Sequence, residues 1–212
     1  MWVKLMVIKH LNERGKQITY HPGDWVNVPP TYGRLWIAQG DAQVPGQDPF
    51  PELRADGIGA IILGKSEVAQ KLLAPYKIQF EEGEPELRWD KTLWIDGNVP
   101  ARPELLPVGF NLLDKWEVCA PLYSYDVLAA NIGNEDEKEA TKAIIRDLRV
   151  PLYDTRLVFV KKCENTKYLL EQYMGYKAQG VNELHAFLRA LYQAKPFVLA
   201  LPATWNSKDA HP

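Results

Sequence analysis

The sequence lacks the features that mark several large protein classes. It holds only two cysteines, Cys119 and Cys163, in 212 residues, which are too few for a disulfide framework and lack the spacing of a zinc site. We expect both to be buried free thiols. No apolar run is long enough to cross a bilayer, because the apolar start carries Lys4 and Lys9. We therefore expect no membrane partner, and a location in the cytoplasm or in an assembly formed there.

Basic runs and phosphate-binding loops are also missing. Lys and Arg number 25 against 27 Asp and Glu, a net charge of -2, and no basic stretch follows the pattern of a nucleic-acid-binding surface. The glycines of residues 57–65 lack the spacing of a P-loop or of a dinucleotide fingerprint, and no serine or cysteine nucleophile elbow occurs. Internal repeats and low-complexity segments are absent. We therefore expect no nucleic-acid partner and no nucleophilic hydrolase site.

The composition that remains is that of a globular protein. With 46% hydrophobic and 25% charged residues, the chain can form one medium domain or two small ones with real cores. Proline and glycine concentrate in residues 45–57, which excludes regular structure there and predicts a linker. The sequence thus predicts a small β-rich module over residues 1–45, a linker over 46–56 and an α/β domain over 57–212.

The first module combines short apolar strands with a tight turn. Residues 3–11 and 24–28 have strand composition, Pro22-Gly23-Asp24 predicts a hairpin turn between strands, and residues 31–44 predict one or two helical turns and a short strand. The pattern Tyr-x-Pro-Gly-Asp-x-Val followed by Leu-x-Ile-Ala-x-Gly-x-Ala resembles a small β-barrel module of tailed-bacteriophage proteins. That resemblance implies a barrel-like fold and a phage origin, and with it a location in the host cytoplasm or in a virion.

Strand and helix patterns alternate after the linker, which favours an α/β sheet flanked by helices. The predicted strands are residues 58–64, 77–82, 92–96, 156–162 and 197–202, and the predicted helices are residues 66–76, 134–148, 164–178 and 182–194.

Two of these helices carry clear start signals. Ser66 is an expected N-cap, and Asn134 with Glu137 three residues later has the form of a capping box. Helical spacing in residues 134–148 predicts an inner face that packs on the sheet, formed by Ala140, Ala143, Ile144 and Leu148.

A carboxylate at a predicted strand end is the main candidate site. Asp96 closes the apolar run of residues 92–96 and is followed by Gly97 and Asn98. Open α/β sheets bind ligands at the carboxyl ends of their strands. An Asp-Gly pair after a strand is also an ordinary turn, so both interpretations of Asp96 stay open.

Three segments together resemble the nucleotide-sugar glycosyltransferases of the GT-A type. They are LWIDGNVPARPELLPVGFNLLDKWEVCAPL, residues 93–122, DTRLVFVKKCENTKYLLEQYMGY, residues 154–176, and NELHAFLRALYQAKPFVLALPATWN, residues 182–206. The resemblance implies a mixed sheet flanked by helices, a nucleotide-sugar substrate and a manganese or magnesium cofactor. The short spacing between the strands ending at residues 64 and 96 implies a truncated form of that fold.

The resemblance also implies site residues. Asp96 takes the place of the first carboxylate of an Asp-x-Asp signature, as catalytic group and cation ligand. Asn98 replaces the second, and its neutral oxygen holds a divalent cation less well. Asp154, Trp205 and Asn206 are expected to bind substrate.

Each of the other candidates also has a structural interpretation. A solvated loop carboxylate suits Asp154, a core aromatic suits Trp205, and a favourable helix start suits Glu183, which is otherwise a candidate base. His185 is expected on an exposed or half-buried side of its helix.

Two functions from different classes follow. The first is sugar transfer from a nucleotide donor, with Asp96 and a cation neutralising the leaving diphosphate. The second is a non-enzymatic head- or tail-associated virion protein that uses the same fold as a scaffold, with phage structural proteins or further copies of itself as partners. The altered signature leaves the choice open, because a fold does not fix a function.

Overall fold

The computed structural model describes residues 2–13, 16–39, 41–43, 57–64, 66–99 and 105–206. The chain divides into two compact units, Met1–Glu52 and Leu53–Ala210, which we describe separately. The predicted linker, residues 46–56, lies outside the described residues.

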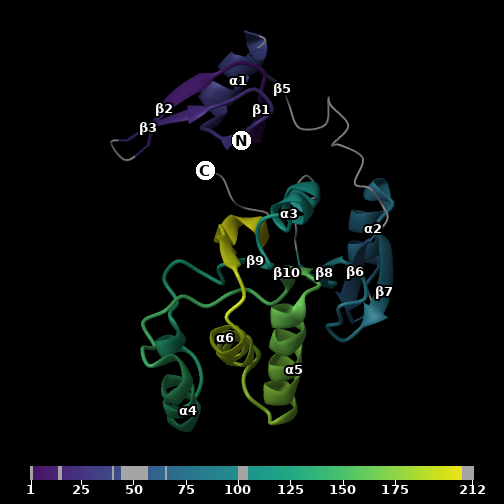
Figure 1. Ribbon diagram of the computed structural model, residues 1–212, viewed down its shortest axis with the longest axis vertical. Coiled ribbons are helices and arrows are strands. Elements are labelled where there is room, and N and C mark those ends of the chain that lie inside the picture. The colour runs from purple at the N-terminus through teal and green to yellow at the C-terminus, as the bar shows by residue number, and fades with distance from the viewer. Residues whose placement is uncertain are drawn as a thin grey trace. The chain divides into compact units, whose positions relative to one another are not determined.

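The first unit is built from short strands and one helix (Figure 1). Strand β1, Trp2–Leu5, pairs antiparallel with β4, Trp25–Asn27, and with β5, Ala42–Gln43. Strands β2, Lys9–Glu13, and β3, Lys16–Tyr20, form a separate hairpin, and α1 spans Pro30–Ala38. The core of this unit consists of Val3, Leu5, Val26, Val28, Trp36 and Ala42.

The β-rich character of this unit is confirmed, but two details of the prediction are wrong. The expected strand 3–11 is two strands, β1 and β2, which belong to different sheets. The turn at Gly23, where φ is +95°, does not close a hairpin, because it joins β3 of one sheet to β4 of the other. The strands of the described residues thus form an open sheet and a hairpin.

The second unit contains a six-stranded mixed sheet. Its strands are β6 (Ile58–Leu63), β7 (Gln79–Gly83), β8 (Lys91–Asp96), β9 (Val118–Pro121), β10 (Leu157–Lys161) and β11 (Val198–Leu201), in the order β11-β9-β10-β8-β6-β7. Only β10 runs antiparallel to its two neighbours, β8 and β9.

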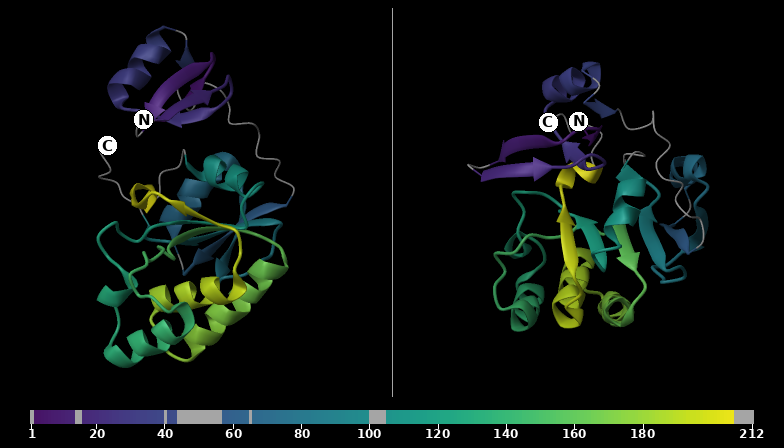
Figure 2. Two further views of the ribbon diagram at one scale, coloured as in Figure 1. Left: turned by 60° about the vertical axis from the view of Figure 1, so that its left-hand side comes forward. Right: turned by 45° about the horizontal axis from the view of Figure 1, so that its top comes forward.

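Helices cover both faces of this sheet. Figures 1 and 2 show α3 on one face and α5 with α6 on the other. The helices are α2 (Glu67–Leu73), α3 (Leu106–Leu112), α4 (Glu135–Ile145), α5 (Glu164–Ala178) and α6 (Glu183–Ala194), with short 3₁₀ turns η1 (Ala74–Tyr76), η3 (Ala129–Asn131) and η4 (Ala203–Asn206). The predicted architecture, a mixed α/β sheet flanked by helices, is confirmed. Among the described residues of this unit, α3, β9 and the 3₁₀ turns η3 and η4 had not been predicted as elements.

Aromatic contacts fill the core on both faces. On the α3 face, Phe110 meets Phe159 of β10 edge to face, with centroids 5.4 Å apart. Gly109 lets α3 approach this closely, because a Cβ there would lie 2.2 Å from the Phe159 ring. On the opposite face, Trp94 of β8 lies nearly parallel to Tyr173 of α5, with centroids 6.4 Å apart. Strands β8 and β10 are therefore the packed centre of the unit.

The cysteines are both free thiols, as predicted. Cys119 of β9 is fully buried, and burial raises the pKa of its thiol to about 12. Cys163, before α5, is only half-buried, contrary to the expectation of a buried thiol, and its thiol donates to the carboxylate of Glu117 at 3.4 Å. Among the described residues, no helix is both long and apolar enough to span a membrane.

The inner face predicted for α4 is confirmed only in part. Asn134 caps the helix through the Glu137 amide at 2.9 Å, as expected. Ile144 and Leu148 are half-buried and pack against the core, but Ala140 and Ala143 are exposed. The buried positions of the helix are Thr141 and Ile145. The helix packs on α6, and the Thr141 hydroxyl accepts a hydrogen bond from Arg189 of that helix, so a count of apolar side chains alone overlooked Thr141.

Glu117 ties three elements together and is expected to make stability depend on acid pH. Its carboxylate accepts hydrogen bonds from the Phe197 amide at 2.9 Å, the Asn165 amide group at 3.1 Å and the Cys163 thiol. Burial raises the pKa of Glu117, but these hydrogen bonds outweigh it and leave the pKa below the ordinary value. The stabilisation is therefore complete above the unfolded-state pKa, about 4.3, and is lost as pH falls through the lower folded-state pKa.

We expect the melting temperature of the wild type to fall below about pH 4 more steeply than that of Glu117→Gln. Melting curves between about pH 7 and pH 3 measure this difference, with Glu139→Gln on the exposed side of α4 as the matched control. Parallel curves for wild type and Glu117→Gln would contradict the role of this carboxylate.

Candidate functional site

The strand order of the sheet reverses at β6. After β6 the chain adds β7 on one side and then returns to place β8 on the other. Ligands of open α/β sheets bind outside the carboxyl ends of the strands at such a switch point. Asp96 is the last residue of β8 and therefore stands at this position, as the sequence led us to expect.

A close backbone contact joins the two strand ends. The Ser66 hydroxyl, just after β6, donates to the Gly97 carbonyl at 2.6 Å and also caps α2 by accepting from the amides of Val68 and Ala69. A Cβ at Gly97 would lie 2.0 Å from the Ser66 Cβ. Glycine is thus required at 97 by a tertiary contact, which the sequence shows only as a turn residue.

Asp96 itself both ends the strand and starts a turn. Its Oδ1 accepts from the Asn98 amide at 2.8 Å, and its carbonyl accepts from the Val99 amide at 3.1 Å. The turn interpretation therefore describes the local backbone correctly, while the side chain stays half-buried at the edge of the sheet. The Asn98 side chain is exposed beside it.

The donor set at this edge suits a cation only in part. Mg²⁺ is commonly held by one or two carboxylates together with phosphate oxygens of a substrate. Asp96 supplies one carboxylate, and Asn98 supplies a weaker amide oxygen. The part of the chain that the structure describes holds no group of three or more His, Cys, Asp or Glu side chains placed to bind a metal.

Arg156 stands directly across from Asp96. The Asp96 amide donates to the Arg156 carbonyl at 2.8 Å, next to the paired residues Ile95 and Leu157. Opposed residues of antiparallel strands project from the same face with Cβ atoms about 4.5–5.5 Å apart. Arg156 is not among the residues predicted from the sequence, although it stands at the start of a predicted strand.

Asp154 holds this arginine in place. Its side chain is 2% exposed and accepts from Arg156 Nε at 2.9 Å and Nη2 at 2.6 Å, and from the Arg156 amide at 3.0 Å. The hydrogen bonds to Asp154 raise the pKa of Arg156 above its usual value, and the charge of Asp96 and the hydroxyl of Tyr123 add to this effect. The description of Asp154 as a solvated loop carboxylate is therefore wrong, and its oxygens are directed at Arg156.

Two exposed tyrosines lie on the loop that follows β9. Tyr123 is 41% exposed and Tyr125 63% exposed. The Tyr125 hydroxyl accepts from the Ala203 amide at 3.3 Å, which holds this ring against η4. Because β9 and β8 run in the same direction, this loop and Asp96 lie at the same edge of the sheet.

The last two candidates belong to η4. Trp205 is 3% exposed and meets Phe159 edge to face with centroids 6.1 Å apart, so its observed contact is with the core. The backbone of Asn206 closes η4, and its side chain lies outside the described residues. The structure thus brings Asp96, Asp154 and Arg156 together and places Trp205 under the packed face of β10.

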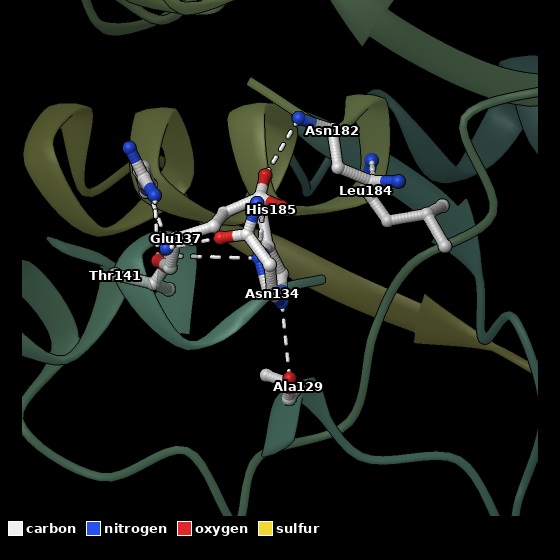
Figure 3. A network of polar contacts seen from close by, with 8 residues as sticks. Ala129, Asn134, Glu137, Thr141, Asn182, Leu184 and His185 are labelled. Carbon is white, nitrogen blue, oxygen red and sulfur yellow. Dashed lines mark hydrogen bonds and ion pairs between the residues drawn. The ribbon is translucent and has the colours of Figure 1, made fainter. Parts of the chain in front are cut away.

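His185 takes part in an internal network and not in the site (Figure 3). It is fully buried, contrary to the expectation of an exposed or half-buried position. One ring nitrogen, Nε2, lies 3.0 Å from the Ala129 carbonyl, and Nδ1 lies 3.6 Å from Glu137 Oε1. Glu183, a candidate base, accepts from the Tyr173 hydroxyl at 2.7 Å. Both side chains thus connect helices.

Replacing Gly97 with alanine tests the geometry of the strand ends. The added methyl group collides with Ser66, so we expect a loss of unfolding free energy of about 1–3 kcal/mol and a displaced Asp96 turn. Gly83→Ala is the matched control, because an added Cβ there meets no atom within 4 Å. Denaturant unfolding of both variants measures the difference, and equal stability would contradict the close contact.

Comparisons with known proteins find only weak similarity to solved structures. The sequence matches no protein-family model and no curated protein. Among solved structures, protein A197 from STIV aligns over 70% of this chain and 82% of its own, with 13% identity and a TM-score of 0.38. A candidate nucleotide-diphospho-sugar transferase from Desulfovibrio desulfuricans G20 aligns over 71% of this chain and 60% of its own, with 15% identity and a TM-score of 0.35.

A third solved structure is 4-diphosphocytidyl-2C-methyl-D-erythritol synthase from Anaerococcus prevotii DSM 20548. It aligns over 74% of this chain and 94% of its own, with 13% identity and a TM-score of 0.41. All three TM-scores are below 0.5, so the function has to be inferred from the chain's own residues.

Proposed function

We propose that the second unit is a nucleotide-sugar-binding, glycosyltransferase-like domain. The observation that carries this proposal is the position of Asp96, at the carboxyl end of β8 and at the switch point of the sheet. A carboxylate there can hold a divalent cation that also binds the diphosphate of a nucleotide sugar. The resemblance of residues 93–122, 154–176 and 182–206 to GT-A enzymes supports the same ligand class.

The charges of the side chains around Asp96 favour the binding of a cation in the absence of the nucleotide. Asp96 and Asp154 carry two negative charges against the single positive charge of Arg156, so the cluster is short of one positive charge. Mn²⁺ or Mg²⁺ at Asp96 would supply it and neutralise the diphosphate that leaves on transfer. Asn98 would add a neutral oxygen to the same ion.

The backbone around Asp96 is built to keep this carboxylate in place. The Asn98 amide fixes Oδ1, and the Ser66–Gly97 contact fixes the turn that follows. Preorganised groups of this kind lose little freedom when a ligand binds. These contacts support a binding site at the strand end, in addition to the turn.

A thermal-shift screen with nucleotide sugars, with and without manganese, tests the proposal. A ligand present at about a hundred times its dissociation constant stabilises the fold by about 2.7 kcal/mol, which is readily detected. We expect a shift that requires manganese for at least one nucleotide sugar. Absence of a shift across uridine, guanosine, cytidine and adenosine diphosphate sugars would reject this function and favour the non-enzymatic scaffold.

A further inference from the structure

We infer that Arg156 is the residue that binds the phosphates of the ligand, and that Asp154 is its positioning residue. This inference rests on the proposed function, since it assigns the anion-binding group of the same site. It replaces the expectation that Asp154 contacts the substrate itself.

The Asp154 carboxylate is already occupied by Arg156. A side chain that is 2% exposed and accepts three hydrogen bonds from one arginine has little capacity left for a ligand. Burying such a carboxylate is costly unless it is paired and hydrogen-bonded. Asp154 therefore has a structural partner, and that partner is the group that reaches the surface.

Part of the Arg156 guanidinium remains available to a ligand. Asp154 engages Nε and Nη2, which leaves Nη1 out of this pair, and the side chain is 47% exposed. A guanidinium presents five N–H donors in a planar fork and recognises phosphate oxygens in pairs. Arg156 is therefore held on one side and open on the other, as an anion-binding arginine requires.

The same local motif occurs twice in the chain, with different burial. Asp147 and Arg149 repeat the Asp-x-Arg pair with equivalent bonds, from the Arg149 amide at 2.9 Å, from Nε at 3.1 Å and from Nη2 at 3.0 Å. There both side chains are exposed, 51% for Asp147 and 82% for Arg149. Only the pair at residues 154 and 156 combines a buried carboxylate with a place opposite Asp96.

The position opposite Asp96 defines the ligand class. A cation on Asp96 and the guanidinium of Arg156 would present two positive groups on one face of the sheet, separated by the spacing of neighbouring strands. Two linked phosphates can contact both groups, whereas a single phosphate engages them less completely. We therefore expect a preference for diphosphates over monophosphates.

The test is calorimetric titration of the full chain with inorganic pyrophosphate in the presence of manganese. Arg156→Gln is expected to weaken pyrophosphate binding about tenfold or more, because a charged hydrogen-bonding group is lost. Arg156→Lys should retain only part of the affinity, since an ammonium lacks the planar fork. Arg149→Gln, the matched control from the exposed pair, should bind like the wild type.

Asp154→Asn separates positioning from folding. We expect weaker binding of pyrophosphate and a smaller advantage of pyrophosphate over inorganic phosphate, because the guanidinium is no longer held in one orientation. A purely structural role would lower the melting temperature and leave that ratio unchanged, so the ratio is the decisive readout.

Two outcomes would overturn the inference in distinguishable ways. If the wild type binds nucleotide sugars and Arg156→Gln binds them and pyrophosphate equally well, Arg156 is not the phosphate-binding residue and the proposed function stands. If the wild type binds neither pyrophosphate nor any nucleotide sugar, both the inference and the proposed function are rejected.

Discussion

Replacing Phe159 with alanine is expected to lower the unfolding free energy of the second unit by about 3–5 kcal/mol. Phe159 is fully buried at the centre of β10 and touches the rings of Phe110 and Trp205. Gly109 of α3 also lies against it and has no side chain that could move into the cavity. The lost contacts and the cavity add together, because this part of the core has little means of collapsing.

Denaturant unfolding of the full chain, followed by tryptophan fluorescence, measures this loss. Phe197→Ala is the matched control: Phe197 stands just before β11 and is 68% exposed, so its removal should cost below about 1 kcal/mol. Equal losses for the two variants would show that β10 is not the packed centre of the sheet.

Thr141→Val is expected to lower the unfolding free energy by about 1–3 kcal/mol, although valine has nearly the same shape as threonine. The Thr141 hydroxyl donates to the Glu137 carbonyl at 2.7 Å and accepts from Arg189 Nε at 2.9 Å, in a region where Thr141 is fully buried and Arg189 is 5% exposed. Valine leaves the Nε–H group of a buried guanidinium without this partner, and unpaired buried charges are costly.

A double-mutant cycle with Arg189→Met isolates the interaction. The double variant should be more stable than the sum of the two single losses predicts, because the buried donor and its acceptor are removed together. Strict additivity would contradict a direct coupling between α4 and α6 at this point. The melting temperatures of the four proteins, measured at one pH, decide between these outcomes.

The sheet and most helices of the second unit were predictable from the sequence, because their signals are local. The apolar run before Asp96 predicts β8, Ser66 and Asn134 mark helix starts, and the periodicity of residues 182–194 predicts α6. The buried Thr141 of α4 was not predicted, because its polar hydroxyl is satisfied by Arg189 from another helix. Such a partner has no local signature.

The candidate site was predictable only at Asp96, which the pattern of a strand followed by a turn identifies. The role of Arg156 depends on strand order, since it faces Asp96 only because β10 is antiparallel to β8. Asp147-x-Arg149 and Asp154-x-Arg156 look alike in sequence, and burial alone separates them. Likewise, the contact between Gly97 and Ser66 joins residues 31 positions apart.

The most direct test of the central claim compares Asp96→Asn with the wild type in nucleotide-sugar binding and turnover, with manganese present. Asp136→Asn, on the exposed start of α4, is the control for the loss of one charge. We expect Asp96→Asn to keep its melting temperature within a few degrees, because a half-buried strand-end carboxylate adds little stability. It should lose manganese-dependent binding and turnover, because the main anionic ligand of the cation is gone. Binding and turnover that survive in Asp96→Asn as in Asp136→Asn would contradict the account.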